Sequence, residues 1–238
     1  MRRLLPGPVA DVDDLWNAYA LPAAQHLRAG FVQSVDGAVI VNGRSAPLSG
    51  PVDRQVFRVL RAVCDVVLVG AGTVRAENYG PVDLPEPMRD RRTSEGRAAR
   101  PTLAVVTRTG EVDPNSRLFS DPTQQVVVVT TRSADTRALP SHVQVIVAGD
   151  DDVDLPQGLA ALRALGYQRV LCEGGPQLLH QLLADDAVDQ LCLTMSPLLI
   201  GGAPGLLPTT LAGSRPMRLT TLLEQEGVLL TTWDLTHV

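Results

Sequence analysis

The sequence contains no lysine, and all 21 of its basic residues are arginine. This absence excludes enzymes that bind substrate as a Schiff base on lysine, phosphate loops that depend on a lysine, and lysine general bases. The formal net charge is −5, a mildly acidic balance that argues against a surface for nucleic acid or for an anionic membrane. We therefore expect neither nucleic acid nor a membrane as a partner.

Aromatic residues and cysteines are also scarce. Aromatics make up 3% of the 238 residues against 45% hydrophobic residues, so the core is expected to consist mainly of Leu, Val and Ala. The three cysteines lie in apolar runs and are expected to be buried thiols (Cys64, Cys172 and Cys192). The four histidines lack the spacing of metal ligands, so no metal site is expected.

Long apolar segments are missing as well. No run approaches the ~18 apolar residues that a membrane-spanning helix needs. Residues 1–14 contain prolines and aspartates where a signal peptide has its apolar stretch. These absences, together with the unpaired cysteines, predict a cytoplasmic location.

The most informative stretch is a short apolar run that is followed by two glycines and a helical pattern. The run ends in Glu173, and Gly174, Gly175 and Pro176 precede leucines that are spaced along one helix face. Proline suits the first position of a helix, and glycines let backbone N–H groups and the positive helix end approach an anion. Two interpretations stay open: a simple turn, or a ligand loop with a carboxylate at a strand end.

Strand-like and helical segments alternate along most of the chain, which is typical of an α/β domain. We expect one domain with a central mixed, mainly parallel sheet that is flanked by helices and ends in an antiparallel hairpin. The expected strands are 29–34, 65–70, 102–107, 125–131, 143–148, 170–172 and 187–195, the hairpin strands are 218–223 and 228–235, and the expected helices are 11–20, 51–63, 155–165 and the segment after Pro176.

Two segments carry several arginines. Arg54, Arg58 and Arg61 follow one face of the helix predicted for residues 51–63, either as a solvated stripe or with Arg61 in an anion pocket. Residues 78–101 are rich in proline and charge and have no periodicity. Because this segment is long for a connection, it predicts a functional or mobile loop.

Two predicted strands end in an arginine beside a hydroxyl. These ends are Thr107-Arg108 and Thr131-Arg132-Ser133. Such a pair suits the 2′-phosphate that distinguishes NADP from NAD, although an ordinary strand-end charge is the alternative.

Five short motifs occur in an order that resembles the riboflavin-biosynthesis pyrimidine reductase family. They are Ser34–Gly37 (SVDG), Val69–Val74 (VGAGTV), Glu77-Asn78, Glu173–Gly175 (EGG) and Pro197–Gly202 (PLLIGG). This family is the reductase half of the bifunctional deaminase-reductases, and its fold is like that of dihydrofolate reductase. The resemblance covers residues 29–238, which leaves 1–28 as an N-terminal extension with a short helix. The zinc motif of the deaminase half is missing, so only a reductase domain is expected.

The resemblance implies NADPH as the cofactor. Its pyrophosphate is expected at the helix that begins after the two glycines. With the strand-end residues added, the expected cofactor-binding residues are Val32, Thr73, Glu77, Thr107, Arg108, Arg132, Gly174, Gly175, Pro176, Gln177 and Leu178. A homodimer is expected on the same ground.

The resemblance also implies a phosphorylated ribosylamino-pyrimidine as the substrate. Ser45, Arg61 and Glu173 match substrate-contacting positions, with Arg61 as a phosphate partner. Asp36 and Glu173 are the catalytic candidates that would hold or protonate the pyrimidine side. The expected reaction is hydride transfer from NADPH to the ribose C1 of 5-amino-6-(5-phosphoribosylamino)uracil, in riboflavin biosynthesis.

The sequence departs from the family pattern at three places. Gly30 stands where a lysine is common, Glu77-Asn78-Tyr79 replaces an acidic-Asp-Pro segment, and an arginine is missing near Leu84. These departures put the phosphate contacts in doubt, so two alternatives stay open. One is an NADPH-dependent dihydrofolate or pterin reductase, and the other is a nucleotide-binding pseudoenzyme.

Overall fold

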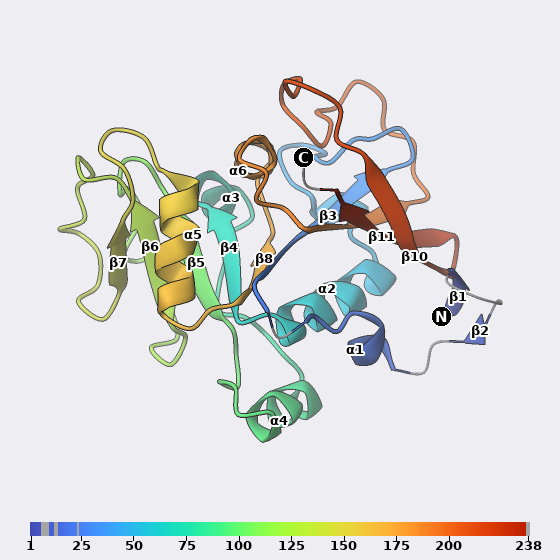
Figure 1. Cartoon of the computed structure of the whole chain (residues 1–238), viewed down its shortest axis with the longest axis horizontal. Helices are drawn as coiled ribbons and strands as arrows, with labels where there is room; N and C mark the ends of the chain where they lie inside the picture. The colour runs from blue at the N-terminus through green and yellow to red at the C-terminus, as the bar shows by residue number, and fades with distance from the viewer. Residues whose placement is uncertain (6–9, 12–13, 23, 237–238) are drawn as a thin grey trace.

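A long mixed β-sheet forms the centre of the molecule (Figure 1). The computed structural model describes residues 1–5, 10–11, 14–22 and 24–236. Its strands are β1 (Arg2–Leu5), β2 (Ala10–Asp11), β3 (His26–Ser34), β4 (Val66–Gly70), β5 (Thr102–Val106), β6 (Val126–Thr130), β7 (Gln144–Val147), β8 (Arg169–Cys172), β9 (Gln190–Ser196), β10 (Met217–Gln225) and β11 (Val228–Leu235). Its helices are α1 (Leu15–Ala18), α2 (Pro51–Val63), α3 (Ala71–Ala76), α4 (Glu86–Ser94), α5 (Leu155–Ala164) and α6 (Pro176–Ala184), with short 3₁₀ turns η1 (Ala46–Leu48) and η2 (Arg117–Phe119).

The sheet has 11 strands in the order β2-β1-β10-β11-β9-β3-β8-β4-β5-β6-β7. The part from β9 to β7 is parallel, and β11, β10, β1 and β2 add an antiparallel part. The hairpin of β10 and β11 turns at Glu226 and Gly227, whose φ angles of 54° and 79° suit a two-residue hairpin turn. The predicted α/β fold, with its mixed, mainly parallel sheet and C-terminal hairpin, is confirmed.

The order of the strands reverses beside β3. After β3 the chain forms β4 and continues outward through β5, β6 and β7, and it then returns to place β8 between β3 and β4. Open α/β sheets bind ligands outside the carboxyl ends of the strands where such a reversal occurs. The ends of β3, β4 and β8 are therefore the edge at which a site is expected.

Helices cover both faces of this sheet. On one face, α2 buries an apolar stripe that includes Val56 and Leu60, and its bounds are those predicted from the helical spacing of these residues. On the other face, α5 and α6 pack on the parallel strands through Leu159 and Leu179, among others. Figure 1 shows α5 lying across β5 and β6. None of the helices in the described ranges is long and apolar enough to span a membrane.

The segment 78–101 differs from its prediction as a loop, because residues 86–94 form the helix α4. Arg92 on this helix is 1% exposed and donates hydrogen bonds to the carbonyl oxygens of Ala62 at 2.8 Å and Cys64 at 2.6 Å. These contacts satisfy carbonyl groups near the end of α2 and hold α4 against the domain. Because α4 is held by the contacts of a buried arginine and not by an apolar face, its sequence lacks the periodicity that predicts a helix.

The N-terminal region also differs from its prediction in detail. The first parallel strand begins at His26 rather than at residue 29, and β1 pairs with β10 in the same sheet. The helix predicted for residues 11–20 is the shorter α1, and residues 12–13 of that prediction lie outside the described residues. The expected buried thiols are confirmed, since Cys64, Cys172 and Cys192 are free and buried.

Candidate active site

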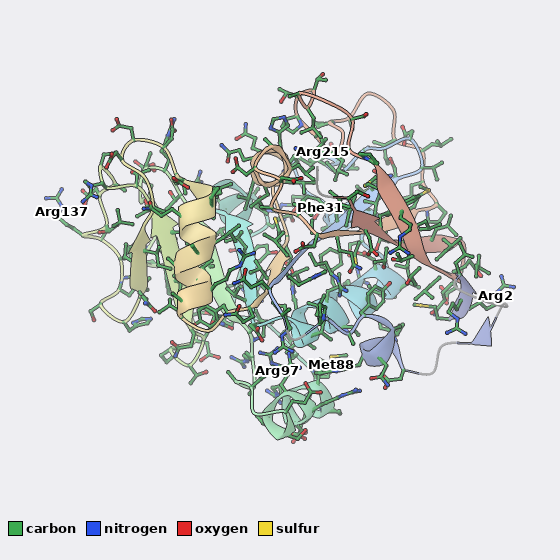
Figure 2. The ribbon with its side chains drawn as sticks, viewed as in Figure 1. Arg2, Phe31, Met88, Arg97, Arg137 and Arg215 are labelled. Carbon is green, nitrogen blue, oxygen red and sulfur yellow. The ribbon has the colours of Figure 1, made fainter. Side chains whose placement is uncertain are left out.

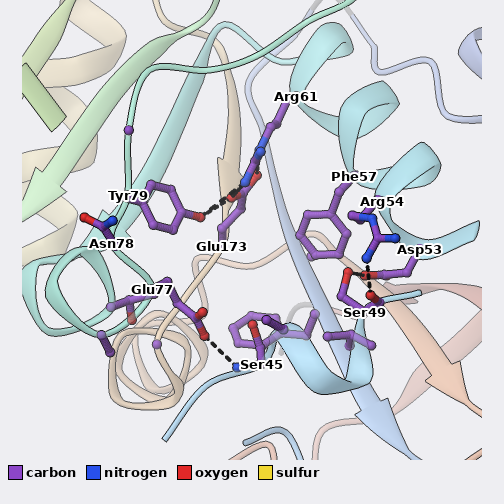
Figure 3. A pocket seen from close by; sticks show the side chains of 18 of the residues that line it. Ser45, Ser49, Asp53, Arg54, Phe57, Arg61, Glu77, Asn78, Tyr79 and Glu173 are labelled. Carbon is purple, nitrogen blue, oxygen red and sulfur yellow. Dashed lines mark hydrogen bonds and ion pairs between the residues drawn. The ribbon is translucent and has the colours of Figure 1, made fainter. Parts of the chain in front are cut away.

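A cavity of about 640 Å³ opens at the carboxyl ends of β3, β4 and β8. Residues from β3, α2, α3, the segment 77–83 and the start of α6 line it, so elements far apart in the sequence meet there. This volume lies in the range of small-molecule sites. Figure 3 shows the polar side chains of this cavity.

The cavity is centred on an ion pair between two residues that the sequence predicted as substrate contacts. Arg61 Nε and Nη2 each lie 2.6 Å from an oxygen of the Glu173 carboxylate. Tyr79 donates its phenolic hydrogen to the same carboxylate (Figure 3). The Glu173 side chain is 2% exposed and that of Arg61 is 27% exposed, so solvent reaches only the arginine.

These contacts set the charge of the cluster. Burial lowers the pKa of Arg61, but the Glu173 carboxylate outweighs it and the pKa rises above its ordinary value. Burial and the Glu173 carboxylate raise the pKa of Tyr79 well above its ordinary value, so the phenol stays protonated and donates. Arg61 therefore already has a carboxylate partner, which the prediction of a phosphate contact did not include.

Ser45 and Glu77 are a second pair of predicted site residues that the structure brings together. The Ser45 backbone N–H donates to Glu77 Oε1 at 2.6 Å, and both residues line the cavity. Glu77 directly follows α3, and Ser45 directly precedes η1. This hydrogen bond therefore links the loop after β3 to the end of α3, the helix after β4, at the wall of the cavity.

The glycine loop after β8 is closely packed against the helix after β4. The Gly70 N–H donates to the Gly174 carbonyl at 2.8 Å, and a Cβ on Gly175 would lie 2.8 Å from Thr73 Oγ1. Pro176 begins α6, and the N–H groups of Gly175, Gln177 and Leu178 have no acceptor among the described residues. Unpaired amides at a helix start are the groups that bind phosphate oxygens.

Six of the predicted cofactor residues are not among the residues that line the cavity. Gly174, Gln177 and Leu178 belong to the glycine loop and the start of α6, and Thr107, Arg108 and Arg132 follow β5 and β6. Thr107 is buried, whereas the side chains of Arg108 and Arg132 are 69% and 78% exposed. Arg108 pairs with Asp152 at 3.6 Å and Arg132 with Asp150 at 3.0 Å. Such exposed pairs contribute little stability, so either arginine can exchange its partner for a phosphate.

Asp36 is not among the residues that line the cavity. Its carboxylate accepts hydrogen bonds from Ser34 Oγ at 2.6 Å and from the Gly201 N–H at 2.7 Å. These bonds lower the pKa of Asp36 to about 2. Asp36 thus fastens the end of β3 to the segment 197–202, and the structure does not bring it together with Glu173.

Two residues of the cavity were missed in the sequence. Tyr79 was noted only as a departure from a family pattern, and Asp53 reads as an ordinary acidic residue in the first turn of a helix. Asp53 is 2% exposed and lines the cavity. Its spacing to Val52 and Val56 on α2 was the only available signal for its burial.

The model of the RibD C-terminal domain family matches residues 25–229. The chain belongs to this family. The family prediction is therefore confirmed, and with it the prediction of a reductase. The 2,5-diamino-6-ribosylamino-4(3H)-pyrimidinone 5′-phosphate reductase of Methanothermobacter thermautotrophicus is 28% identical over 171 residues, which are 71% of this chain and 76% of that protein.

Two further proteins are similar to this chain, one in sequence and one in fold. The reductase of the same name from Archaeoglobus fulgidus is 28% identical over 172 residues, or 71% of this chain and 78% of that protein. A pyrimidine reductase-like protein of Corynebacterium diphtheriae superposes with a TM-score of 0.83 at 26% identity. That match covers 94% of this chain and 99% of the other, so the two share their whole architecture.

Proposed function

We propose that the chain is an NADPH-dependent reductase of riboflavin biosynthesis that transfers a hydride to the ribose C1 of a phosphorylated ribosylamino-pyrimidine. The observation that carries this proposal is the position of Glu173. It directly precedes the glycine loop, and its buried carboxylate faces the same cavity as Thr73, Gly175 and Pro176. A substrate held at Glu173 would therefore lie against the surface that suits a dinucleotide.

The residues around the glycine loop fit NADPH. The unpaired amides of Gly175, Gln177 and Leu178 at the start of α6 would hold the pyrophosphate, and Arg108 or Arg132 would hold the 2′-phosphate. Gly175 can pack this closely against Thr73 only because it has no Cβ, which would lie 2.8 Å from Thr73 Oγ1. When bound, the cofactor supplies the hydride.

Glu173 would orient the pyrimidine side of the substrate. Reduction of an opened ribosylamine adds a hydride to C1 of a C=N bond, whose nitrogen carries positive charge when it is protonated. Arg61 and Tyr79 hold the Glu173 carboxylate in place. This carboxylate can accept a hydrogen bond from the protonated nitrogen of the C=N bond and stabilise its positive charge. Because Glu173 lines the cavity and Asp36 does not, Glu173 is the stronger catalytic candidate of the two.

The phosphate end of the substrate would lie near the exposed arginines of the cavity. Arg54, Arg58 and Arg117 line it, whereas the charge of Arg61 is compensated by Glu173. Neither Arg58 nor Arg117 has an ion-pair partner among the described residues. Because their positive charges are not compensated, Arg58 and Arg117 suit a dianionic phosphate better than Arg61, the contact predicted from the sequence.

The proposal is tested in two steps. Titration with NADPH should quench the protein fluorescence and raise the melting temperature, and a protein without either response would overturn it. Steady-state oxidation of NADPH is then compared between the ribosylamino-pyrimidine phosphate and dihydrofolate, the substrate of the alternative reductase. Binding of NADPH without turnover of either compound would favour the pseudoenzyme.

A matched pair of variants locates the phosphate. Arg58→Ala should raise the KM for the phosphorylated substrate by ~10-fold, the scale of one charge-assisted contact. Arg137→Ala removes an exposed arginine outside the cavity and should leave KM unchanged. We also propose that the chain acts as a cytoplasmic homodimer, which analytical ultracentrifugation of the purified protein tests for the oligomeric state.

A further inference from the structure

Asp53 is a buried carboxylate on the wall of the cavity that the proposed chemistry does not use. It lies in the first turn of α2 and is 2% exposed. Its Oδ2 accepts a hydrogen bond from Ser49 Oγ at 2.5 Å (Figure 3). Its Oδ1 is also buried and has no hydrogen-bond partner within the described part of the chain. One oxygen of this buried carboxylate is thus left unsatisfied by the described residues.

A role in folding alone does not account for this carboxylate. An acidic residue in the first turn of a helix interacts favourably with the helix dipole, but it can do so while exposed to water. Here burial raises the pKa of Asp53, and although Ser49, Thr194 and Arg54 act in the opposite direction, the net shift is upward. Burial of a charge without an ion pair costs free energy, so the group destabilises the fold unless a ligand satisfies it.

The surroundings of Asp53 suit a flat heterocycle. Phe57 follows on the same helix, and Val32 and Val39 add apolar surface to the lining of the same cavity. Glu173 faces this space as well, and its negative charge adds to the upward shift of the Asp53 pKa. A ring bound in the cavity would therefore face the Asp53 carboxylate on one side and the Glu173 carboxylate on another.

A carboxylate with an open edge accepts two neighbouring N–H donors. A 2-amino-4-oxopyrimidine presents such a pair, because its 2-amino group and its N3–H point in the same direction. A uracil ring presents N3–H between two carbonyl groups, and one of these would face a carboxylate oxygen. Sites built around a buried polar group discriminate strongly against a ligand that leaves it unpaired.

We propose that Asp53 is the specificity-determining residue that reads the 2-amino and N3–H edge of the pyrimidine. The reductase then acts on the 2-amino ring, and not on the uracil that the sequence led us to expect. Glu173 meets the opposite side of the ring, where the ribosylamino nitrogen lies. This inference rests on the proposed function for its substrate, but its recognition step is independent of hydride transfer.

The experiment uses two substrates that differ at one position of the ring. These are 2,5-diamino-6-ribosylamino-4(3H)-pyrimidinone 5′-phosphate and 5-amino-6-(5-phosphoribosylamino)uracil. The full-length protein should show a kcat/KM for the diamino compound that is at least ~10-fold higher. The Asp53→Asn variant should lose or reverse this preference, because an amide can donate to the 2-carbonyl of uracil while it accepts from N3–H.

Two controls distinguish a change in substrate specificity from a general loss of folding or of cofactor binding. Asp53→Asn should retain NADPH affinity, since Asp53 lies away from the glycine loop in the sequence and is not among the expected cofactor contacts. Asp121→Asn removes a half-buried aspartate that pairs with Arg100 and does not line the cavity, and it should keep the wild-type preference. Equal preference in wild type and Asp53→Asn would overturn the inference, whatever the absolute rates.

A binding measurement keeps the test valid if turnover fails or the variant does not fold. The thermal shift of the wild-type protein is compared between 2-amino-4-oxopyrimidine and uracil at equal concentration. A selective shift with the amino compound supports the role of Asp53 even if neither phosphate is reduced, which would overturn only the proposed function. Dihydropterin carries the same pair of donors, a 2-amino group beside N3–H. Reduction of dihydropterin in place of the ribosylamino compound would therefore identify a pterin as the substrate that Asp53 recognises.

Discussion

Arg61 and Glu173 lie 112 residues apart in the chain and form a bidentate ion pair in which both N···O distances are 2.6 Å. The Glu173 carboxylate is almost fully buried, so Arg61→Gln would leave it without its charge partner. We expect a loss of about 2–3 kcal/mol in the free energy of unfolding, below the full cost of breaking a buried pair because Arg61 is partly exposed. Urea unfolding measures this loss.

The double variant Arg61→Gln/Glu173→Gln is the control for this prediction. It removes both charges and should recover more than half of the lost stability. If the double variant is no more stable than Arg61→Gln, the ion pair is not the reason for the loss. Both variants should lose reductase activity, because Glu173 no longer presents a fixed carboxylate to the substrate.

Asp53 should give the protein an unusual pH dependence of stability. Its pKa is raised above the ordinary value of 3.8, so ionisation is less favourable in the folded state than in the unfolded chain. The resulting cost is present at neutral pH and disappears as the pH falls through the folded-state pKa. Asp53→Asn should therefore be more stable than wild type at pH 7, with a difference that shrinks toward acid.

Asp121 is the matched control with the opposite sign. Hydrogen bonds from Thr123 and Arg100 lower its pKa to about 2, so the stability it contributes is present above its ordinary value of 3.8 and is lost as the pH falls toward 2. Asp121→Asn should thus be less stable than wild type at neutral pH. Unfolding curves measured across this pH range test both trends, and parallel trends for the two variants would contradict the burial argument for Asp53.

Gly175 should tolerate no side chain. A Cβ at this position would lie 2.8 Å from Thr73 Oγ1, so Gly175→Ala must displace the Thr73 side chain or the glycine loop. We expect a loss of about 1–3 kcal/mol in stability and NADPH binding weaker by ~10-fold or more. Gly213→Ala is the control, because its Cβ would meet no atom within 4 Å and Gly213 does not line the cavity. If Gly175→Ala binds NADPH like the control, the cofactor does not use this loop.

The strand-end arginines should set the choice of coenzyme. Arg132 pairs only with an exposed aspartate and is accessible to a phosphate. Arg132→Ala should reduce the preference for NADPH over NADH by ~10-fold, since it removes one charge-assisted contact to the 2′-phosphate. The ratio of kcat/KM for the two coenzymes measures it, and Arg108→Ala is measured in parallel. An unchanged ratio in both variants would place the 2′-phosphate elsewhere.

The elements with strong periodicity could be predicted from the sequence. The bounds of α2 followed from its apolar spacing, and the buried strands β4 to β6 followed from runs of Val and Leu. The helix α4 could not, because Arg92 holds it through long-range contacts with carbonyl groups. Figure 2 shows Met88 and Arg97 between α4 and the rest of the domain, where Met88 packs against the core and Arg97 donates to the carbonyl oxygens of Ala62 and Val63.

The members of the site could be predicted better than their contacts. The motif order identified Glu173, Arg61, Ser45 and Thr73, which all line the cavity. Local sequence contains no information that Arg61 would bind Glu173, since the pairing depends on how β8 is inserted beside β4. Asp53 was missed for a related reason: an aspartate in a first helical turn is usually exposed, and its burial becomes visible only when β3 and α2 are placed together.

The most direct test of the account is the fate of the hydride. The wild-type protein is incubated with NADPH deuterated at the transferable position of the nicotinamide C4 and with 2,5-diamino-6-ribosylamino-4(3H)-pyrimidinone 5′-phosphate. We expect oxidation of one NADPH per product and a ribitylamino product that carries deuterium at C1 of the sugar. Bound NADPH that is not oxidised, or deuterium found in the pyrimidine ring, would contradict hydride transfer to the ribose.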